Sequence, residues 1–207
     1  MEILLYDIGR RFNRDWIFRN LSYSFKKGSS YAILGRNGSG KSTLLQIIAG
    51  SLSQSEGSIE ILVDGKSIES EELYQSITIA APYLELIEEF TLSEMIDFHF
   101  GFKKYIPGLD KEKLLELLDL KASKNKAIKY FSSGMKQRTK LALAICSDTD
   151  LLLLDEPASN LDTQAITWFQ DLIKDYTENR IVIVCSNQEH EYFFCQNQLQ
   201  MADYKLV

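Results

Sequence analysis

The first third of the chain alternates apolar and polar residues with the period of two that is typical of β-strands. Turn residues such as Lys27-Gly28 separate these runs, and Asp64-Gly65 is a strong hairpin signal that leads toward Ile68. The pattern predicts strands over residues 3–6, 21–25, 30–34, 58–63 and 76–80. We therefore expect the front part of the chain to be rich in β-structure.

Helical periodicity replaces this alternation in the middle of the chain. Capping residues mark three helix starts, at Thr91, at Asp110 and at Ser132 or Ser133. The predicted helices cover residues 42–48, 91–102, 111–120, 132–146, 163–176 and 188–195.

Apolar runs at residues 151–156 and 181–185 predict two more strands, both buried. Strands at both ends of the chain then enclose a helical segment, which indicates one α/β domain with an all-helical subdomain. The expected organisation is a single domain, 1–207, with its core at 1–83 and 148–207 and its helical insert at 84–147.

The composition is that of a soluble globular protein, with 45% hydrophobic and 25% charged residues among 207. The net charge of −6 argues against a nucleic-acid partner. Cys146, Cys185 and Cys195 have no paired spacing, which favours reduced, buried thiols in a cytosolic protein. No signal peptide is recognisable, and no apolar run approaches the ~20 residues of a membrane helix. We expect a chain that works at a membrane only through another protein.

Residues 35–42, GRNGSGKS, match the phosphate-binding pattern G-x-x-x-x-G-K-[ST] in full. Glycines let the backbone turn so that its amides point at phosphate oxygens, and the helix that follows favours an anion at its start. Lys41 is expected to reach the β- and γ-phosphates, and the Ser42 hydroxyl to bind Mg²⁺. The expected nucleotide-binding residues are Gly35, Asn37, Gly38, Ser39, Gly40, Lys41, Ser42 and Thr43.

A second apolar strand, residues 151–154, ends in two adjacent acids, Asp155 and Glu156. Ligands of parallel sheets bind at the carboxyl ends of the strands, so both acids are expected beside the phosphates. Asp155 is the expected Mg²⁺ ligand, together with Ser42. Glu156 is the expected catalytic residue, which polarises the attacking water.

The segment YFSSGMKQR, residues 130–138, places Ser132, Ser133 and Gly134 at a helix start, which makes a second anion receptor. The phosphate loop, this segment, LLLLDEP and SNLD follow one another in that order. Together they resemble the ATP-binding cassette, the nucleotide-binding domain of ABC transporters, over nearly the whole chain. In that family ATP lies between two domains arranged head to tail, and the signature serine and glycine of one contact the γ-phosphate held by the other.

The resemblance implies a P-loop NTPase fold, with a RecA-like α/β core, an antiparallel β subdomain and a helical signature subdomain. It implies ATP and Mg²⁺ as ligands, a second ABC domain in a homodimer or heterodimer, and a separate membrane-spanning subunit as partners. The implied location is cytoplasmic, peripheral on the cytoplasmic face of the inner membrane. Asn160, Leu161 and Asp162 match the family's D-loop, a contact between the two sites, and Phe12 falls where an aromatic residue stacks on adenine. Trp16 and Tyr6 are alternatives for that stacking residue.

Two positions depart from the family's pattern. Pro82 stands where the family has a glutamine that contacts Mg²⁺ and the attacking water, and Tyr83 and Glu85 are candidates to replace it. Asn187 stands where the family has a histidine that contacts the γ-phosphate, and its amide can donate a hydrogen bond but cannot become charged. Because Glu156 is kept, these changes predict an active but slow ATPase.

The leading hypothesis is the ATP-binding and ATP-hydrolysing subunit of an ABC transporter, which powers transport through the membrane subunit by ATP-driven dimerisation. Tyr83, Leu84 and Leu86 are expected to form an exposed apolar patch that contacts that subunit. The alternative is a regulatory ABC module without transport, in which ATP binding rather than turnover drives dimerisation. A nucleotide kinase or a GTPase is disfavoured, because neither needs the segment at residues 130–138, which we call the signature segment.

Overall fold

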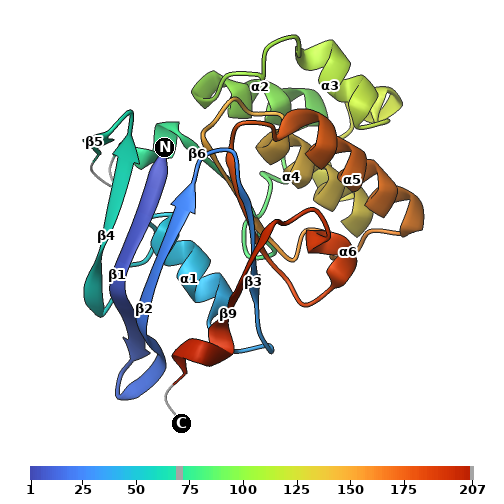
Figure 1. Ribbon diagram of the computed structural model, residues 1–207. Coiled ribbons are helices and arrows are strands. Elements are labelled where there is room, and N and C mark those ends of the chain that lie inside the picture. The colour runs from blue at the N-terminus through green and yellow to red at the C-terminus, as the bar shows by residue number, and fades with distance from the viewer. Residues whose placement is uncertain (69–71, 206–207) are drawn as a thin grey trace. The chain divides into compact units, whose positions relative to one another are not determined.

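The computed structural model describes residues 1–68 and 72–205, which form two compact units (Figure 1). The first unit comprises the described residues of Met1–Ile79, Asp150–Glu156 and the segment from Asn179 onward. The second comprises Ala80–Thr149 and Pro157–Glu178. The phosphate loop and the two adjacent acids therefore belong to the first unit, and the signature segment belongs to the second.

A four-stranded antiparallel sheet opens the first unit, in the order β2-β1-β4-β5. Its strands are β1 (Glu2–Phe12), β2 (Asp15–Lys26), β4 (Glu56–Val63) and β5 (Lys66–Ser67). β1 and β2 are much longer than predicted and form a hairpin that closes with Phe12 paired to Asp15. The sequence signal is weak there because the hairpin end is polar, and Asn13 turns the chain with a φ of 54°.

The second sheet of this unit has the order β6-β7-β8-β3-β9. Its strands are β3 (Ser30–Leu34), β6 (Ile77–Ala80), β7 (Leu151–Asp155), β8 (Ile181–Cys185) and β9 (Asn197–Gln200). β8 pairs in parallel with β7 and β3, and β3 pairs in parallel with β9. Every residue of β3, β7 and β8 is buried, as expected for parallel strands covered on both faces. β9 was not predicted, because Leu199 is its only apolar residue.

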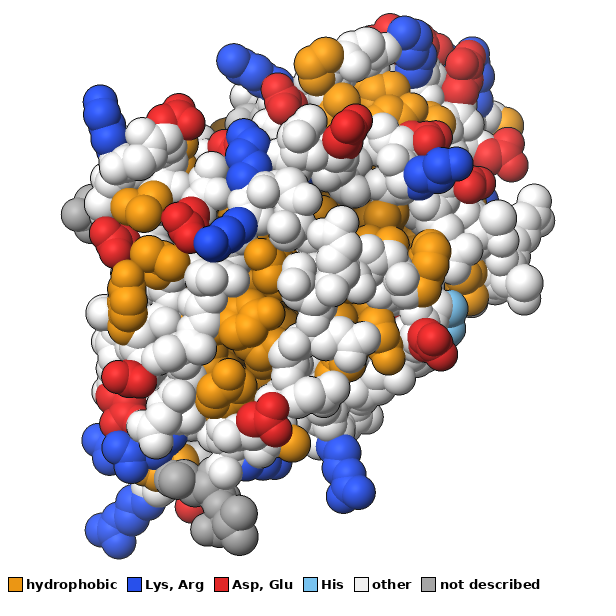
Figure 2. Space-filling view, viewed as in Figure 1, with side chains coloured by type: hydrophobic (Ala, Val, Ile, Leu, Met, Phe, Trp, Pro, Cys, Tyr) orange, Lys and Arg blue, Asp and Glu red, His pale blue; other side chains and the backbone are white. Residues whose placement is uncertain are grey.

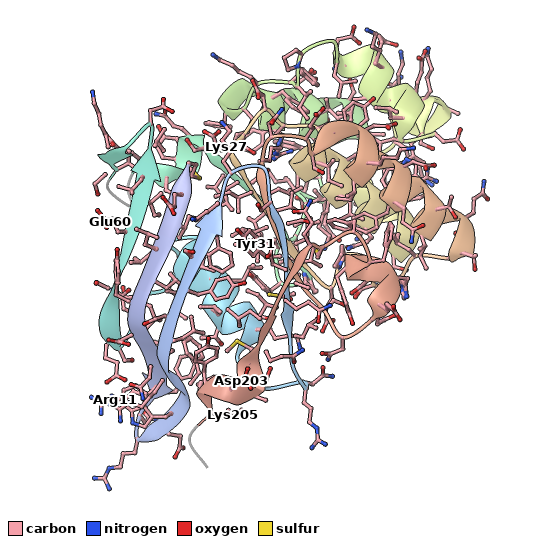
Figure 3. The ribbon with its side chains drawn as sticks, in the orientation of Figure 1. Arg11, Lys27, Tyr31, Glu60, Asp203 and Lys205 are labelled. Carbon is pink, nitrogen blue, oxygen red and sulfur yellow. The ribbon has the colours of Figure 1, made fainter. Side chains whose placement is uncertain are left out.

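Both sheets share one hydrophobic core with α1 (Lys41–Ile48). Phe25 of β2 packs edge-on against Tyr31 of β3, with ring centres 4.9 Å apart (Figure 3). Leu44 and Leu45 of α1 are completely buried in the same cluster. This packing joins the antiparallel sheet to the parallel sheet and to α1. The short helix α6 (Glu189–Tyr192) follows β8 and is shorter than the predicted 188–195.

The second unit is helical. It contains α2 (Leu92–Phe102), α3 (Lys111–Leu117), α4 (Ser133–Ile145) and α5 (Thr163–Tyr176). Single turns of 3₁₀-helix cover Leu73–Gln75 and Met201–Tyr204 in the first unit and Lys121–Ser123 and Ile128–Tyr130 in the second. Among the described residues, no helix has the length and apolar character needed to cross a bilayer.

Predicted caps explain where these helices begin. Thr91 and Glu94 form the capping box of α2, and the Asp110 carboxylate accepts the Lys113 amide at 2.9 Å. Ser132, and not Ser133, caps α4, because its hydroxyl oxygen accepts the amide of Met135 at 3.2 Å. α3 ends three residues before its predicted end, at Leu117.

Candidate nucleotide-binding site

The phosphate loop joins β3 to α1 and turns on three glycines with positive φ: 153° at Gly35, 74° at Gly38 and 100° at Gly40. Two of these glycines also lie against neighbours. A Cβ at Gly40 would lie 2.6 Å from Cγ2 of Ile17, and a Cβ at Gly35 would lie 2.6 Å from Oγ of Ser39. The loop therefore requires glycine for its backbone conformation and for its space.

Lys41 begins α1 and is almost completely buried, with 5% of its surface exposed. Its ammonium donates a hydrogen bond to the Gly35 carbonyl at 2.7 Å, so the side chain folds back across the loop. Residues 37–43 line a cavity of about 180 Å³, and Glu156 lines it with them. Amides at a helix start, a lysine and a cavity form an anion receptor.

Asp155 ends β7 inside the first unit and is 2% exposed. Its Oδ1 is buried and has no hydrogen-bond partner within residues 1–68 and 72–205. Burial raises the pKa of this carboxyl group, and the nearby charge of Glu156 adds to the rise, while a hydrogen bond from Ser42 and the charge of Lys41 oppose it. A buried, under-coordinated carboxylate beside a hydroxyl group fits a divalent cation, which would supply the missing positive charge.

This donor set is small. Over the described residues, no three His, Cys, Asp or Glu side chains gather as a metal site. Mg²⁺ suits such a site because it keeps several waters and takes the remaining ligands from substrate phosphates. Ser42 and Asp155 are thus the residues that fit Mg²⁺ here.

Glu156 follows Asp155 and has a φ of 45°, which is strained for a residue with a side chain. Its amide donates to the Cys185 carbonyl at 2.9 Å, and this bond fixes the backbone at the end of the sheet. The bent backbone brings the Glu156 side chain to the wall of the phosphate-loop cavity.

Asn187 also lies beside the phosphate loop. Its Nδ2 donates to Oδ1 of Asn37 at 3.0 Å, although the two residues are 150 positions apart. Ser186 and the fully buried Glu191 hydrogen-bond one another just behind it and fix the turn after β8. This arrangement holds a neutral amide at the end of β8, against the loop.

The signature segment lies at the start of α4 in the second unit. Ser132 and Ser133 are exposed, and a Cβ at Gly134 would meet the Asn160 carbonyl at 3.3 Å. Asn160 has a φ of 64°, and Asp162 caps α5 by accepting the Ala165 amide at 2.8 Å. The signature glycine and the loop before α5 therefore touch within one unit.

A cavity of about 410 Å³ lies beside this contact. Ser132, Gly134 and Asp162 help to line it, together with Arg138 and Trp168. The Arg138 guanidinium packs over the Trp168 ring at 4.8 Å from its centre. Arg138, in the second turn of α4, thus packs against Trp168 of α5, while Ser132 and Ser133 remain exposed.

A sequence model of the family described as ABC transporter matches residues 18–159 of the chain. The chain belongs to the ABC transporter family. Its architecture, with a parallel sheet and a separate antiparallel sheet around a phosphate loop, is the predicted P-loop fold of the family's ATP-binding proteins, so that prediction is confirmed.

Relatives are spread over several kinds of ABC transporter protein. The energy-coupling factor transporter ATP-binding protein EcfA1 of Thermotoga maritima is 30% identical over 93% of the chain and 74% of its own length. The cytochrome c biogenesis ATP-binding export protein CcmA of Agrobacterium fabrum is 28% identical over 99% of the chain and 97% of its length. An uncharacterised ABC transporter ATP-binding protein of Bacillus subtilis, YcbN, is 35% identical over 77% of the chain, and the match spans 53% of that relative.

Two solved structures share the fold. A putative ABC transporter ATP-binding protein from Pyrococcus furiosus superposes over 100% of both chains, with a TM-score of 0.80 and 18% identity. A bacterial Atm1-family ABC exporter with ATP bound covers 96% of this chain and 37% of its own, with a TM-score of 0.80 and 20% identity.

Pro82, which we predicted to stand at the family's glutamine position, lies in the second unit just after β6. The ammonium of Lys140 donates to the carbonyls of Ala81 and Leu84 on either side of it, at 3.4 and 3.2 Å. Tyr83 and Leu84 are exposed. Leu86 is half-buried against the core of this unit, so it contributes less to the expected exposed patch than Tyr83 and Leu84.

Phe12 ends β1 and is 47% exposed. Ile17, near the start of β2, lies against Gly40, so this end of the hairpin adjoins the phosphate loop. Trp16, the first alternative, is half-buried. Tyr6, the second, lies farther back along β1, where it pairs with Ser58. Phe12 is therefore the aromatic residue that combines exposure with a place beside the loop.

Sequence reasoning missed the residues that support these positions. Ile17 and Lys140 act through contacts with residues far away in the chain. The isolated sequence carries no signal for such contacts, because each depends on how the strands and helices meet.

Proposed function

We propose that the chain is the ATP-hydrolysing subunit of an ABC transporter. The observation that carries the proposal is the cavity that the phosphate loop shares with Glu156, next to the buried Asp155. A phosphate loop alone supports nucleotide binding. A carboxylate in the same cavity supports hydrolysis, because an attacking water needs a group that orients and polarises it.

In this proposal the amides of residues 37–43 bind the β- and γ-phosphates of ATP. The ammonium of Lys41 turns from the Gly35 carbonyl to the phosphate oxygens. Ser42 and Asp155 hold Mg²⁺, which neutralises charge on the β- and γ-phosphates when it is bound. Glu156 accepts a hydrogen bond from the attacking water, and Asn187 donates its amide to the γ-phosphate.

We expect turnover to be slow. Pro82 has no side chain that can ligate Mg²⁺ or orient water, and Asn187 cannot carry a positive charge. Losing one positioned donor at a centre where charge develops typically costs about 10²–10³ in rate.

The proposed active assembly is a head-to-tail dimer. Ser132, Ser133 and Gly134 at the start of α4 would contact the γ-phosphate held by the phosphate loop of a second ABC domain. The exposure of both serines and their place at a helix start support this role. Asp162, in the loop beside Gly134, would contact the second domain between the two sites.

The proposed partner outside the dimer is a membrane-spanning subunit. Tyr83 and Leu84, which directly follow Pro82, are exposed and would carry part of that contact. The chain would then be cytoplasmic and peripheral on the cytoplasmic face of the inner membrane.

ATP turnover by the wild type and by Glu156→Gln tests the hydrolysis proposal. We expect measurable phosphate release by the wild type and a fall to background for the variant, with Mg²⁺-ATP still bound. Sedimentation of Glu156→Gln tests the dimer, which should form with Mg²⁺-ATP and not with Mg²⁺-ADP. Equal background rates for both proteins would contradict hydrolysis.

The second candidate is a regulatory ABC module that binds ATP, dimerises and hydrolyses weakly. Pro82 and the neutral Asn187 favour it, since both weaken the hydrolytic machinery. A nucleotide-driven dimer together with background turnover in the wild type would support this function instead.

A further inference from the structure

Arginines gather around the aromatic residues at the end of the β1–β2 hairpin. Figure 2 shows basic side chains there, and Figure 3 labels Arg11 among them. The guanidinium carbon of Arg10 lies 4.5 Å from the centre of the Phe12 ring. Those of Arg11 and Arg19 lie 5.6 and 4.2 Å from the centre of the Trp16 ring. Guanidinium groups at these distances are attracted by the ring faces.

The two aromatic rings differ in what they offer a ligand. Trp16 is half-buried and carries two guanidinium groups, and one of them, that of Arg19, also forms a two-point ion pair with Glu56. Phe12 carries the guanidinium of Arg10 and keeps about half of its surface exposed. Phe12 is therefore the ring with surface left for a planar group.

Arg10 is itself held in place. Its Nη1 donates to the Ser53 carbonyl at 2.8 Å, in the loop before β4. The neighbouring backbone binds the same loop, since the Ser55 amide donates to the Gly9 carbonyl at 2.7 Å. An arginine that is anchored by its backbone and by its guanidinium group loses little further freedom when a ring packs against it.

The register of the hairpin joins Arg10 to the phosphate loop. Arg10 pairs with Phe18 across the strands, and a Cβ at Gly40 would lie 3.0 Å from the Phe18 ring. Arg10 is thus paired with the residue that lies against Gly40, directly before α1, and Phe12 lies two positions farther along β1.

We propose that Arg10 is a positioning residue for the nucleotide base: it packs on one face of Phe12 and holds the ring so that the base stacks on the exposed face. The inference rests on the proposed nucleotide binding and on the role of Phe12. Arg10 acts through the ring, so its effect requires both Phe12 and a base on the ligand. A cation that acted through the phosphates would require neither.

Mg²⁺-ADP and inorganic pyrophosphate are suitable probes, because the first carries a base, the second does not, and neither is hydrolysed here. Their dissociation constants would be measured by calorimetry on the full chain. Stacking contributes about 1–3 kcal/mol per base, so Phe12→Ala should weaken ADP about 5- to 150-fold. An exposed cation–π contact contributes about 0.5–1 kcal/mol, so Arg10→Ala should weaken ADP about two- to fivefold. Pyrophosphate affinity should not change in either variant.

Three further variants sharpen the test. Arg10→Gln keeps a polar, neutral side chain and loses the cation, so it should match Arg10→Ala. Arg11→Ala removes a guanidinium group from Trp16 and should leave ADP affinity unchanged. In the Phe12→Ala background, Arg10→Ala should have no further effect on ADP affinity.

The possible failures can be told apart. If Phe12→Ala weakens ADP but Arg10→Ala does not, or if Arg10→Ala weakens pyrophosphate equally, the inference about Arg10 is wrong. An effect of Arg10→Ala that persists without Phe12 also overturns it. If Phe12→Ala leaves ADP affinity unchanged while Lys41→Ala abolishes binding, the stacking role of Phe12 is wrong and the nucleotide site stands. If Lys41→Ala changes neither ligand's affinity, the proposed nucleotide site itself fails.

Discussion

The side-chain amide of Asn187 donates a hydrogen bond to Oδ1 of Asn37, 3.0 Å away in the phosphate loop. This bond fixes which way both amides point. Asn187 keeps a second amide hydrogen for a ligand, and Asn37 presents its own NH₂ group. Two neutral amides therefore meet at the position predicted to correspond to the family's histidine, and their protonation does not change near neutral pH.

Turnover should consequently depend little on pH around neutrality. We expect the wild-type rate to stay level between about pH 6 and pH 8, whereas Asn187→His should gain a titration limb centred near about pH 6.5. ATPase profiles against pH measure this. Gln188 is the exposed residue that follows Asn187, so Gln188→His is the matched control and should leave the pH profile level. A limb near that pH in the wild type would contradict the prediction.

Asp155 should make the protein less stable as the pH rises in the absence of Mg²⁺. Burial raises the pKa of its carboxyl group above the ordinary value of 3.8. Between the two pKa values the folded state binds more protons than the unfolded state, so the free energy of unfolding falls as the pH rises through that window. Asp155→Asn removes this dependence and should raise the free energy of unfolding at pH 7 by about 1–2 kcal/mol.

Thermal unfolding from about pH 4 to pH 7, with and without Mg²⁺-ADP, checks this prediction. Mg²⁺-ADP should stabilise the wild type more than Asp155→Asn. Asp171→Asn, on the exposed face of α5, is the matched control and should follow the wild type. Equal pH dependence in wild type and Asp155→Asn would show that the buried carboxylate is compensated in another way.

Lys140 of α4 should hold the residues around Pro82 against that helix. Its ammonium bonds the Ala81 and Leu84 carbonyls, and one turn earlier Lys136 pairs with Glu88 at 2.5 Å. Burial lowers the pKa of Lys140, and the charge of Glu85 opposes this. Burial of the ammonium therefore costs free energy, and its hydrogen bonds to the two carbonyls offset part of that cost.

We expect Lys140→Met to accelerate amide exchange in residues 83–88 about tenfold, the effect of losing roughly 1.4 kcal/mol of local stability. Hydrogen exchange read by mass spectrometry gives the rate, and ADP affinity should not change. Lys111→Met, which removes an ion pair with Asp97 in the same unit, is the control. Unchanged exchange in residues 83–88 would mean that the other contacts of these residues hold them in place.

Gly134→Ala should weaken the ATP-driven dimer without affecting nucleotide binding by the monomer. The added Cβ would lie 3.3 Å from the Asn160 carbonyl, so the loop before α5 must shift by a few tenths of an ångström. In the Glu156→Gln background we expect at least about a tenfold weaker dimer by sedimentation, which corresponds to roughly 1.4 kcal/mol. Gly101→Ala in α2, where a Cβ meets nothing within 4 Å, should dimerise normally. Equal dimerisation of both alanine variants would contradict the role of this contact.

The sequence predicted the structural features that depend only on residues close together in the chain. The phosphate loop is one contiguous stretch, so its glycines, Lys41 and Ser42 could be recognised together. Thr91 and Asp110 were recognised as caps, because a cap needs only residues three positions apart. The fold class followed from the family resemblance and from strands at both ends of the chain.

What the sequence did not predict depends on contacts over long distances in the chain. The bond between Asn37 and Asn187 joins two loops through the pairing of β3 with β8. Arg10 is anchored by the carbonyl of Ser53, 43 positions away, and the polar stretch in which it lies carries no strand pattern. Leu86 was expected to be exposed, and it is half-buried because it packs against the helices of the second unit.

The bond from Lys41 to the Gly35 carbonyl has a consequence for the reaction cycle. The lysine already has an internal acceptor at 2.7 Å, so an arriving phosphate exchanges one oxygen partner for another. The gain on binding is the difference between two contacts, and a departing product leaves the ammonium with a replacement partner. The internal hydrogen bond therefore reduces the net free energy that the Lys41 contact contributes to nucleotide binding, and this favours release of the product.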